Sequence, residues 1–312
     1  MKRKRTRNSL MSEYQQQPSL SETKSDLYLP DECWECVFRF LNNGHDRNNS
    51  SLKSLCAVSK QFLSITNRLQ FSISISDPTS LCLSRLFQRF PNLTSLCLTH
   101  YYRDDSSLAS SIRMKCTQNS VDNSNSLFVS PQLKSLHLIS SQWLRDKSFK
   151  MIASVFPNLQ LFNLSYCFPI SEEGIFQVLR TCSELRHLNL TGLRGWKLHG
   201  MNFEVPKLEV LNLSYTNVND KTLCVISKCC RGLLQLLLEL CYLVTQKGVK
   251  YVLEKCTQLR EINLKRCVQV DDDVLTSLIF SRPSLRKLTS PYGYRFSDRE
   301  MELLSRQGCI VC

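Results

Sequence analysis

One short leucine phrase recurs along the chain, and this recurrence limits most strongly how the chain can fold. The phrase L-x-x-L-x-L-x-x-C begins at Leu159, with Phe162 at its second leucine position, and returns at Leu259, with Ile262 at that position. Its first leucine recurs at intervals of 40, 26, 26, 23, 25, 26 and 26 residues, at Leu93, Leu133, Leu159, Leu185, Leu208, Leu233, Leu259 and Leu285. A period near 26 residues predicts a stack of similar units, each of which folds against its neighbours.

Each unit is predicted to hold a strand and then a helix. The last two leucines of the phrase alternate with other residues, so both point to one face of a strand. In the following half, Ile175, Val178 and Leu179 have the i, i+3, i+4 spacing of a helix. A proline ends the preceding helix two residues before five of the repeat leucines, at positions 91, 131, 157, 206 and 283.

The cysteines follow the same register. They close the strand phrase at Cys167, Cys241 and Cys267, and they precede the next repeat leucine by three residues at Cys182, Cys230 and Cys256. This pattern resembles the cysteine-containing, plant-like subclass of leucine-rich repeats, which is found mostly in F-box proteins. The resemblance covers residues 91–308. It implies a right-handed α/β solenoid of about eight repeats, with a curved parallel sheet inside and helices outside.

Composition and charge favour a cytoplasmic or nuclear protein. The 312-residue chain holds 16 cysteines and no recognisable signal peptide, so we expect reduced thiols rather than a disulfide framework. No run of about 18 apolar residues occurs, and no membrane span is predicted. The net charge of +13 includes a basic run at residues 2–7, which fits a nuclear-import signal or a solvated tail equally well. Nucleic-acid binding is disfavoured because no aromatic residues interleave with these charges.

The segment before the repeats is predicted to be a small helical module. Residues 1–26 are polar and predicted to be disordered, whereas Trp34, Val37, Phe38 and Leu41 have helical spacing. The phrases L-P-x-E, V-F-x-x-L and L-x-x-V-S-K-x-F within residues 27–70 resemble the F-box motif. That resemblance implies binding of a Skp-type adaptor of a cullin-RING ubiquitin ligase. The residues it implies for this contact are Leu29, Pro30, Glu32, Val37, Phe38 and Leu41.

The remaining segments are predicted as connections. Residues 71–90 are expected to link the module to the solenoid, with a helix that carries Leu83, Leu86, Phe87 and Phe90. The 40-residue interval after Leu93 is expected to hold a polar loop. Residues 309–312 fit the C-a-a-X prenylation pattern only loosely, and we predict an unmodified tail.

No catalytic, cofactor or metal site is predicted. The sequence lacks a P-loop, a G-x-S-x-G phrase and an H-E-x-x-H phrase. The acidic run 271–273 aligns with Ser171 and Asn219 at the polar start of each repeat helix, where such residues act as caps. A zinc site built from the cysteine pairs 33/36 and 309/312 would need the two ends of the solenoid to meet, and is therefore disfavoured.

The resemblance implies a non-catalytic substrate-recognition subunit of an SCF-type ubiquitin ligase. Its concave face would bind a target protein through strand residues His137, Asn163, His187, Asn189, Asn212, Gln235, Glu239, Glu261, Asn263 and Lys265. Tyrosines are expected near the rim of that face at Tyr166, Tyr215, Tyr242, Tyr292 and Tyr294. Two alternatives are a ligase-independent scaffold and a small-molecule sensor like some plant F-box repeat proteins.

Overall fold

The computed structural model describes residues 29–42, 50–76, 83–100, 129–141, 144–168, 170–195, 198–270, 279–280, 282–291 and 296–312. The helices are α1 (Asp31–Asn42), α2 (Ser50–Leu55), α3 (Lys60–Arg68), α4 (Leu83–Arg89), α6 (Asp146–Val155), α7 (Glu172–Thr181), the 3-10 helix η1 (Leu198–Gly200), α8 (Asp220–Cys229), α9 (Gln246–Lys255) and α11 (Asp298–Arg306). The strands are β1 (Ser72–Ser76), β2 (Ser95–Thr99), β3 (Ser135–Ile139), β4 (Leu161–Asn163), β5 (His187–Asn189), β6 (Val210–Asn212), β7 (Gln235–Leu237), β8 (Glu261–Asn263), β9 (Lys287–Thr289) and β10 (Ile310–Val311).

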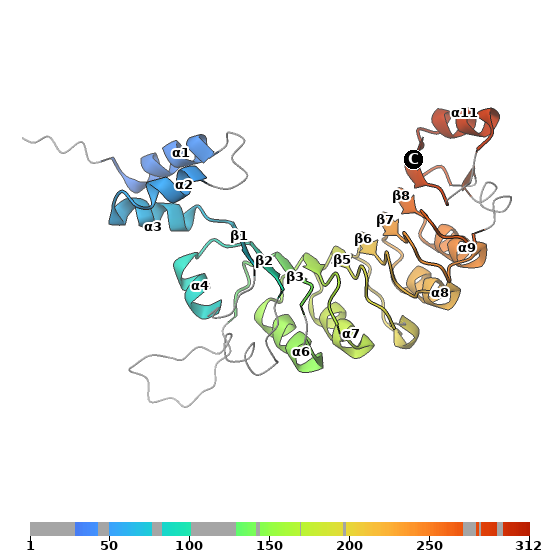
Figure 1. The fold of residues 1–312 in the computed structure, drawn as a ribbon, viewed down its shortest axis with the longest axis horizontal. Coiled ribbons are helices and arrows are strands. Elements are labelled where there is room, and N and C mark those ends of the chain that lie inside the picture. Colours follow the sequence, from blue (N-terminus) through green and yellow to red (C-terminus); the bar gives the residue numbers. More distant parts are fainter. Residues whose placement is uncertain are drawn as a thin grey trace, which may run out of the picture.

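The strands form one parallel sheet whose spatial order is the order of the sequence, from β1 to β10. Figure 1 shows the sheet curving along the inner, concave side, while α4, α6, α7, α8 and α9 lie along the outer side. The helical module of α1, α2 and α3 precedes the sheet at its first strand. The predicted α/β solenoid is therefore confirmed. None of the described helices is both long and apolar enough to cross a lipid bilayer.

The sheet extends beyond the predicted range of 91–308 at both ends. Strand β1 lies within the predicted connector and pairs with β2, and β10 lies within the predicted tail and pairs with β9. In β1, Ile73 and Ile75 alternate with serines and pack against the core of the solenoid. The predicted connector helix is present as α4. Strand β1 was not predicted from the leucine phrase, because its sequence S-I-S-I-S contains no leucine.

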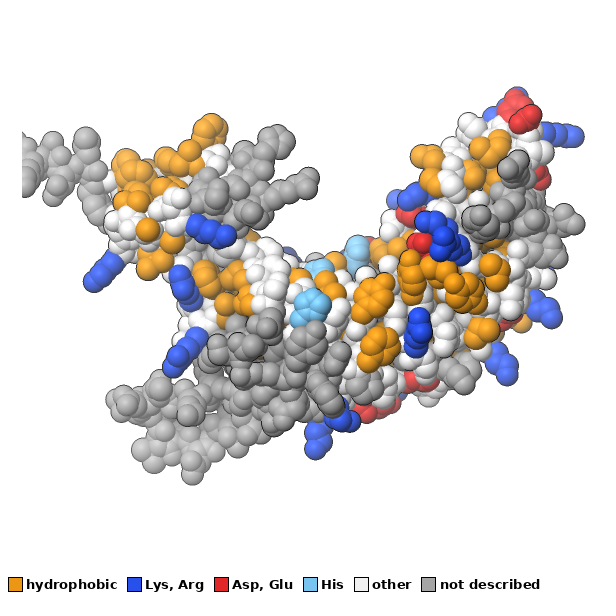
Figure 2. Space-filling view, viewed as in Figure 1, with side chains coloured by type: hydrophobic (Ala, Val, Ile, Leu, Met, Phe, Trp, Pro, Cys, Tyr) orange, Lys and Arg blue, Asp and Glu red, His pale blue; other side chains and the backbone are white. Residues whose placement is uncertain are grey.

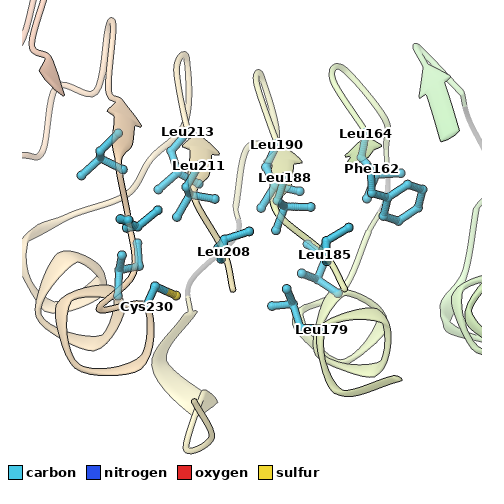
Figure 3. Close-up of a cluster of buried hydrophobic side chains, with 14 of the residues drawn as sticks. Phe162, Leu164, Leu179, Leu185, Leu188, Leu190, Leu208, Leu211, Leu213 and Cys230 are labelled. Atoms are coloured by element: carbon cyan, nitrogen blue, oxygen red, sulfur yellow. The ribbon is translucent and has the colours of Figure 1, made fainter. Parts of the chain in front are cut away.

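The leucines of the phrase form a continuous core between the sheet and the helices. Figure 3 shows Leu185, Leu188 and Leu190 of one repeat pointing toward Leu208 and Leu211 of the next. Each of these five side chains is buried. Because one repeat covers the apolar side of the next, the units gain their core only by stacking. The short interval after Leu185 is closed by η1 in place of an α-helix.

The repeat cysteines link neighbouring repeats. The thiols of Cys241 and Cys267 donate to the carbonyls of Leu213 and Leu238 in the preceding repeats, each with Sγ 3.1 Å from the oxygen. Cys256 donates in the same way to Cys230, with 3.5 Å between Sγ and the carbonyl oxygen. A thiol is small enough for this buried site and also supplies a weak donor to a carbonyl. All described cysteines are free thiols.

We predict two classes of thiol reactivity. Burial raises the pKa of Cys182 and Cys267 to about 12. These thiols are therefore shielded from reagents in solution and remain protonated at neutral pH. Cys33, Cys36 and Cys312 are exposed. A water-soluble alkylating reagent followed by mass spectrometry should modify the exposed cysteines first, and the repeat cysteines only in denaturant. Rapid alkylation of Cys182 or Cys267 in the native protein, or a native disulfide at either, would contradict this prediction.

The starts of the repeat helices also match the prediction. The Ser171 side chain accepts a hydrogen bond from the backbone N–H of Gly174, and that of Asn219 accepts from Thr222. Asp220 extends the connection to the next repeat, because its carboxylate accepts from the N–H of Thr245 at 2.9 Å. The acidic run 271–273, the polar insertion at 103–107 and 119–126, the tail 1–26 and Tyr292 and Tyr294 lie outside the described residues.

Candidate functional site

The helical module has a core of its own. Phe38, Leu52, Ile65 and Leu69 are buried together, and partly buried side chains, including Trp34, pack around them. The Phe62 ring centroid lies 4.8 Å from that of Phe38 and 4.7 Å from that of Trp34. These edge-on and tilted aromatic contacts tie α1 to α3. The module therefore buries an apolar cluster that is separate from the core of the solenoid.

Charged groups reinforce the packing of α1 on α3. The guanidinium of Arg68 donates to Asp31 at 2.8 Å and to Glu35 at 2.9 Å, and the Gln61 amide donates to Asp31 at 2.9 Å. The hydrogen bonds from Gln61 and Arg68 lower the pKa of Asp31. The acids on this side of α1 are thus bound within the module. Glu32, which the sequence assigns to the adaptor contact, is exposed at the start of the same helix.

The module also carries exposed apolar side chains. We call this set the module face: Leu29, Val37, Phe40, Leu41 and Val58. Phe40 is 81% exposed and Val58 is 66% exposed, which are unusual values for large apolar residues. Leu29, Val37 and Leu41, three of the residues predicted for the adaptor contact, are exposed, and the predicted Pro30 is also exposed next to Leu29. Figure 2 shows hydrophobic side chains gathered on the module.

Phe38 is a correction to the predicted contact. Its side chain is 1% exposed and belongs to the core of the module, so it cannot lie on an exposed face. Phe40, which the sequence analysis did not include, is exposed on the same helix. The signal was present in the spacing: Cys33, Val37 and Phe40 follow one another at i, i+4 and i+7, which defines a second stripe on α1.

Eight of the ten predicted target-contact residues lie on strands β3 to β8, which line the concave side of the solenoid, and Glu239 and Lys265 lie two residues after β7 and β8. Four asparagines accept a hydrogen bond at Oδ1 from the backbone N–H two residues later: Asn163, Asn189, Asn212 and Asn263, at 2.9 to 3.0 Å. These side chains hold the chain at the end of each strand. Their carbonyl oxygens are therefore engaged within the repeat. The phrase N-x-S/T/K recurs at four strands, and its asparagine is the last residue of β4, β5, β6 and β8.

His137 joins this polar row near the beginning of the sheet. Its Nε2 lies 2.9 Å from the Ser135 hydroxyl, and its Nδ1 lies 3.3 Å from the Asn163 amide nitrogen. Burial lowers the pKa of His137, which favours a neutral ring that accepts at Nδ1 and donates at Nε2. His187, the other predicted histidine, is exposed on β5.

Charged residues gather toward the other end of the concave side. Glu239 pairs with Lys265 at 3.3 Å, and Glu261 pairs with Lys287 at 2.8 Å. Gln235 is half-buried on the neighbouring β7. The concave side therefore changes from uncharged side chains near β3 to paired charges near β8. Lys287 was not among the predicted contact residues.

Among the residues that the structure describes, no cluster of three or more His, Cys, Asp or Glu side chains has the arrangement of a metal site.

The sequence was compared with protein families and with curated proteins. No family model matches the chain. A stretch of 181 residues, 56% of this chain, is 25% identical to F-box/LRR-repeat protein 4 from Bos taurus. The chain spans only 29% of the length of that relative.

Solved structures match this chain at low sequence identity. The crystal structure of the Rad7 and Elc1 complex in yeast superposes with a TM-score of 0.52 at 16% identity, covering 89% of this chain and 85% of that one. An internalin C2 from Listeria monocytogenes matches with a TM-score of 0.49 at 16% identity, covering 78% and 91% of the two chains. The sheet, the repeat register and the superposition on the Rad7 and Elc1 complex show a leucine-rich-repeat fold.

Proposed function

We propose that this protein is a substrate-recognition subunit of an SCF-type ubiquitin ligase in the cytoplasm or nucleus. The helical module binds a Skp-type adaptor and, through it, a cullin-RING ligase. The solenoid binds a target protein. The chain itself performs no bond chemistry; it holds the target beside the ubiquitin-conjugating enzyme, so that transfer to a target lysine becomes nearly intramolecular.

The observation that carries this proposal is the module face. Large apolar side chains exposed together on a small folded unit mark an interaction surface, because leaving them in water costs free energy. Val37, Phe40 and Leu41 lie within five positions of α1, and Val58 follows α2. Such a helical stripe suits a partner with an apolar groove or a helix of its own.

Two comparisons support the same reading. The relative in Bos taurus is named for an F-box and leucine-rich repeats, the two features that the sequence of this chain resembles. Rad7, whose fold this chain shares, was crystallised as a complex with a second protein, Elc1.

Alanine at both Leu29 and Pro30 should abolish co-purification of a Skp-type adaptor with the full chain. Truncating an interface anchor costs about 1–4 kcal/mol, which is roughly ten- to several-hundred-fold in affinity. Both residues are exposed, so the module should stay folded. Affinity purification with a tagged full chain measures the adaptor retained, and far-UV circular dichroism with a melting curve measures the fold.

The matched control is Ile310→Ala, which truncates an exposed aliphatic residue at the far end of the solenoid. It should leave adaptor retention unchanged. If the double variant retains the adaptor at the wild-type level, the ligase proposal loses its main support, and a ligase-independent scaffold becomes the better account. If the chain unfolds instead, residues 29 and 30 stabilise the module rather than bind a partner.

A further inference from the structure

The turns that follow the strands are aligned by a second ladder of backbone hydrogen bonds. The N–H of Tyr166 donates to the carbonyl of Thr191 at 2.8 Å, and that of Tyr215 donates to Glu239 at 2.7 Å. Gly192 and Leu240 donate to the next repeat in the same way. The residues at and just after these positions are therefore held side by side along one edge of the sheet.

The aligned residues have a left-handed backbone, which residues other than glycine and asparagine rarely adopt. Positive φ angles of 53° to 75° occur at His100, Ser140, Tyr166, Gly192, Tyr215, Leu240 and Arg266. Gly192 meets this requirement without strain. Tyrosine meets it poorly, yet tyrosine stands at two of these positions. A strained backbone beneath an exposed aromatic ring points to a role outside the fold.

Exposed apolar side chains follow this edge across four repeats. We call the set the apolar rim: Tyr166, Phe168, Tyr215, Tyr242, Leu243 and Val268. Val268 is 65% exposed and Tyr242 is 52% exposed. The Tyr166 ring lies over Gly192, where an added Cβ atom would come within 2.5 Å of the ring carbon Cδ1. Figure 2 shows hydrophobic side chains gathered over the second half of the solenoid, with Lys and Arg side chains beside them.

The charges along the rim have one sign. Within its described segments 166–168, 192–195, 215–218, 240–244 and 266–268, the charged residues are Arg194 and Arg266, and both are exposed. The carboxylate of Glu239, the residue before segment 240–244, is paired with Lys265. The rim therefore presents aromatic and aliphatic side chains together with positive charge that no rim carboxylate neutralises.

We propose that the apolar rim binds an extended acidic segment of the target protein that also carries aromatic or aliphatic side chains. This inference rests on the proposed function, since it names the chemistry of the target that the solenoid would hold. Tyrosine and arginine are the residues that anchor protein interfaces most often. Two arginines are few for tracking a phosphate backbone, and Leu243 and Val268 offer no ring on which a base could stack. A peptide therefore fits this rim better than a nucleic acid.

The test uses the full chain and a library of random 12-residue peptides displayed on phage. Selected peptides should be enriched in Asp and Glu next to Tyr, Phe or Leu. A fluorescein-labelled selected peptide then gives the dissociation constant by fluorescence polarisation. Peptides that lack acidic residues, or binding that survives every rim variant below, would overturn the proposal.

Asparagine at both Tyr166 and Tyr215 removes the rings and suits the left-handed backbone, so this variant should fold at least as well as the wild type. Its peptide affinity should fall by about tenfold or more. Glutamate at both Arg194 and Arg266 should weaken binding to a similar extent. The matched charge control is glutamate at Lys221 and Lys228, which are exposed on α8 at the outer side of the solenoid. It makes the same change in net charge and should leave peptide affinity unchanged.

A labelled 20-nucleotide single strand of DNA serves as the competing probe. If it binds the rim with an affinity that the Arg194 and Arg266 substitutions abolish, while no peptide is selected, the peptide proposal is wrong. Adaptor binding is measured separately on the module face. Loss of adaptor binding with intact peptide binding contradicts the proposed function alone, and the reverse result contradicts only the inference about the rim.

Discussion

Replacing Phe162 with alanine should lower the free energy of unfolding of the solenoid by about 3–5 kcal/mol, the usual cost of emptying a buried aromatic site. Phe162 lies on β4, is fully buried, and packs edge-to-face against Phe149 of the neighbouring repeat with ring centroids 6.3 Å apart. Figure 3 shows its ring directed into the core. Because each repeat is stabilised by its neighbours, a cavity here weakens the contacts to both adjoining repeats.

The matched control for this prediction is Phe168→Ala. Phe168 lies in the turn after the same strand and is exposed, so its truncation should change stability by no more than about 0.5 kcal/mol. Urea unfolding followed by far-UV circular dichroism gives both values. Equal effects of the two substitutions, or a loss below about 1 kcal/mol for Phe162→Ala, would contradict the core described here.

Phe38→Ala should unfold the helical module while the solenoid stays folded. The substitution removes a buried ring that packs against Trp34 and Phe62, at a cost of about 3–5 kcal/mol. A module of this size rarely has more than about 3–5 kcal/mol of stability from its core. We therefore expect rapid hydrogen exchange throughout α1 and α3, loss of adaptor binding, and an unchanged unfolding transition for the solenoid.

Phe40→Ala makes the same chemical change two residues further along the same helix. Phe40 is exposed, so α1 should keep its protection from hydrogen exchange, and only adaptor affinity should fall, by about 1–4 kcal/mol. Comparing Phe38→Ala with Phe40→Ala therefore distinguishes the contribution of the module core to folding from the contribution of the module face to adaptor binding. A folded module in Phe38→Ala would show that the aromatic cluster contributes little, and unchanged adaptor affinity in Phe40→Ala would remove Phe40 from the contact.

Periodicity in the sequence was sufficient to predict the repeats. Leucines such as Leu188 and Leu211 recur at one register, and a buried strand position tolerates few other residues, so the pattern indicates both strand and core. The ends of the sheet were not predictable in this way. Strand β1 carries isoleucines without the phrase, and β10 has only two residues, so neither repeats the signal.

The candidate surfaces were predicted less completely than the fold. Helical spacing identified α1, but Trp34 and Phe38 form one apolar stripe and Val37 and Phe40 form another. The stripe that becomes buried is the one against which α3 packs. The spacing of residues within α1 does not show which of the two stripes this is. On the solenoid, Asn189 and its equivalents were predicted as contact residues because they lie on the concave side. Their hydrogen bonds to the backbone depend on a turn geometry that the sequence pattern alone did not reveal.

Hydrogen exchange of the full chain, measured with and without a purified Skp-type adaptor, tests the central claim most directly. We predict that the adaptor slows exchange of backbone amides within residues 31–42 and 50–58, where the module face lies, and leaves residues 129–141 and 144–168 of the solenoid unchanged. The absence of any change in residues 31–42 at saturating adaptor, or protection confined to the solenoid, would contradict the proposal that this protein is carried into a ubiquitin ligase by its helical module.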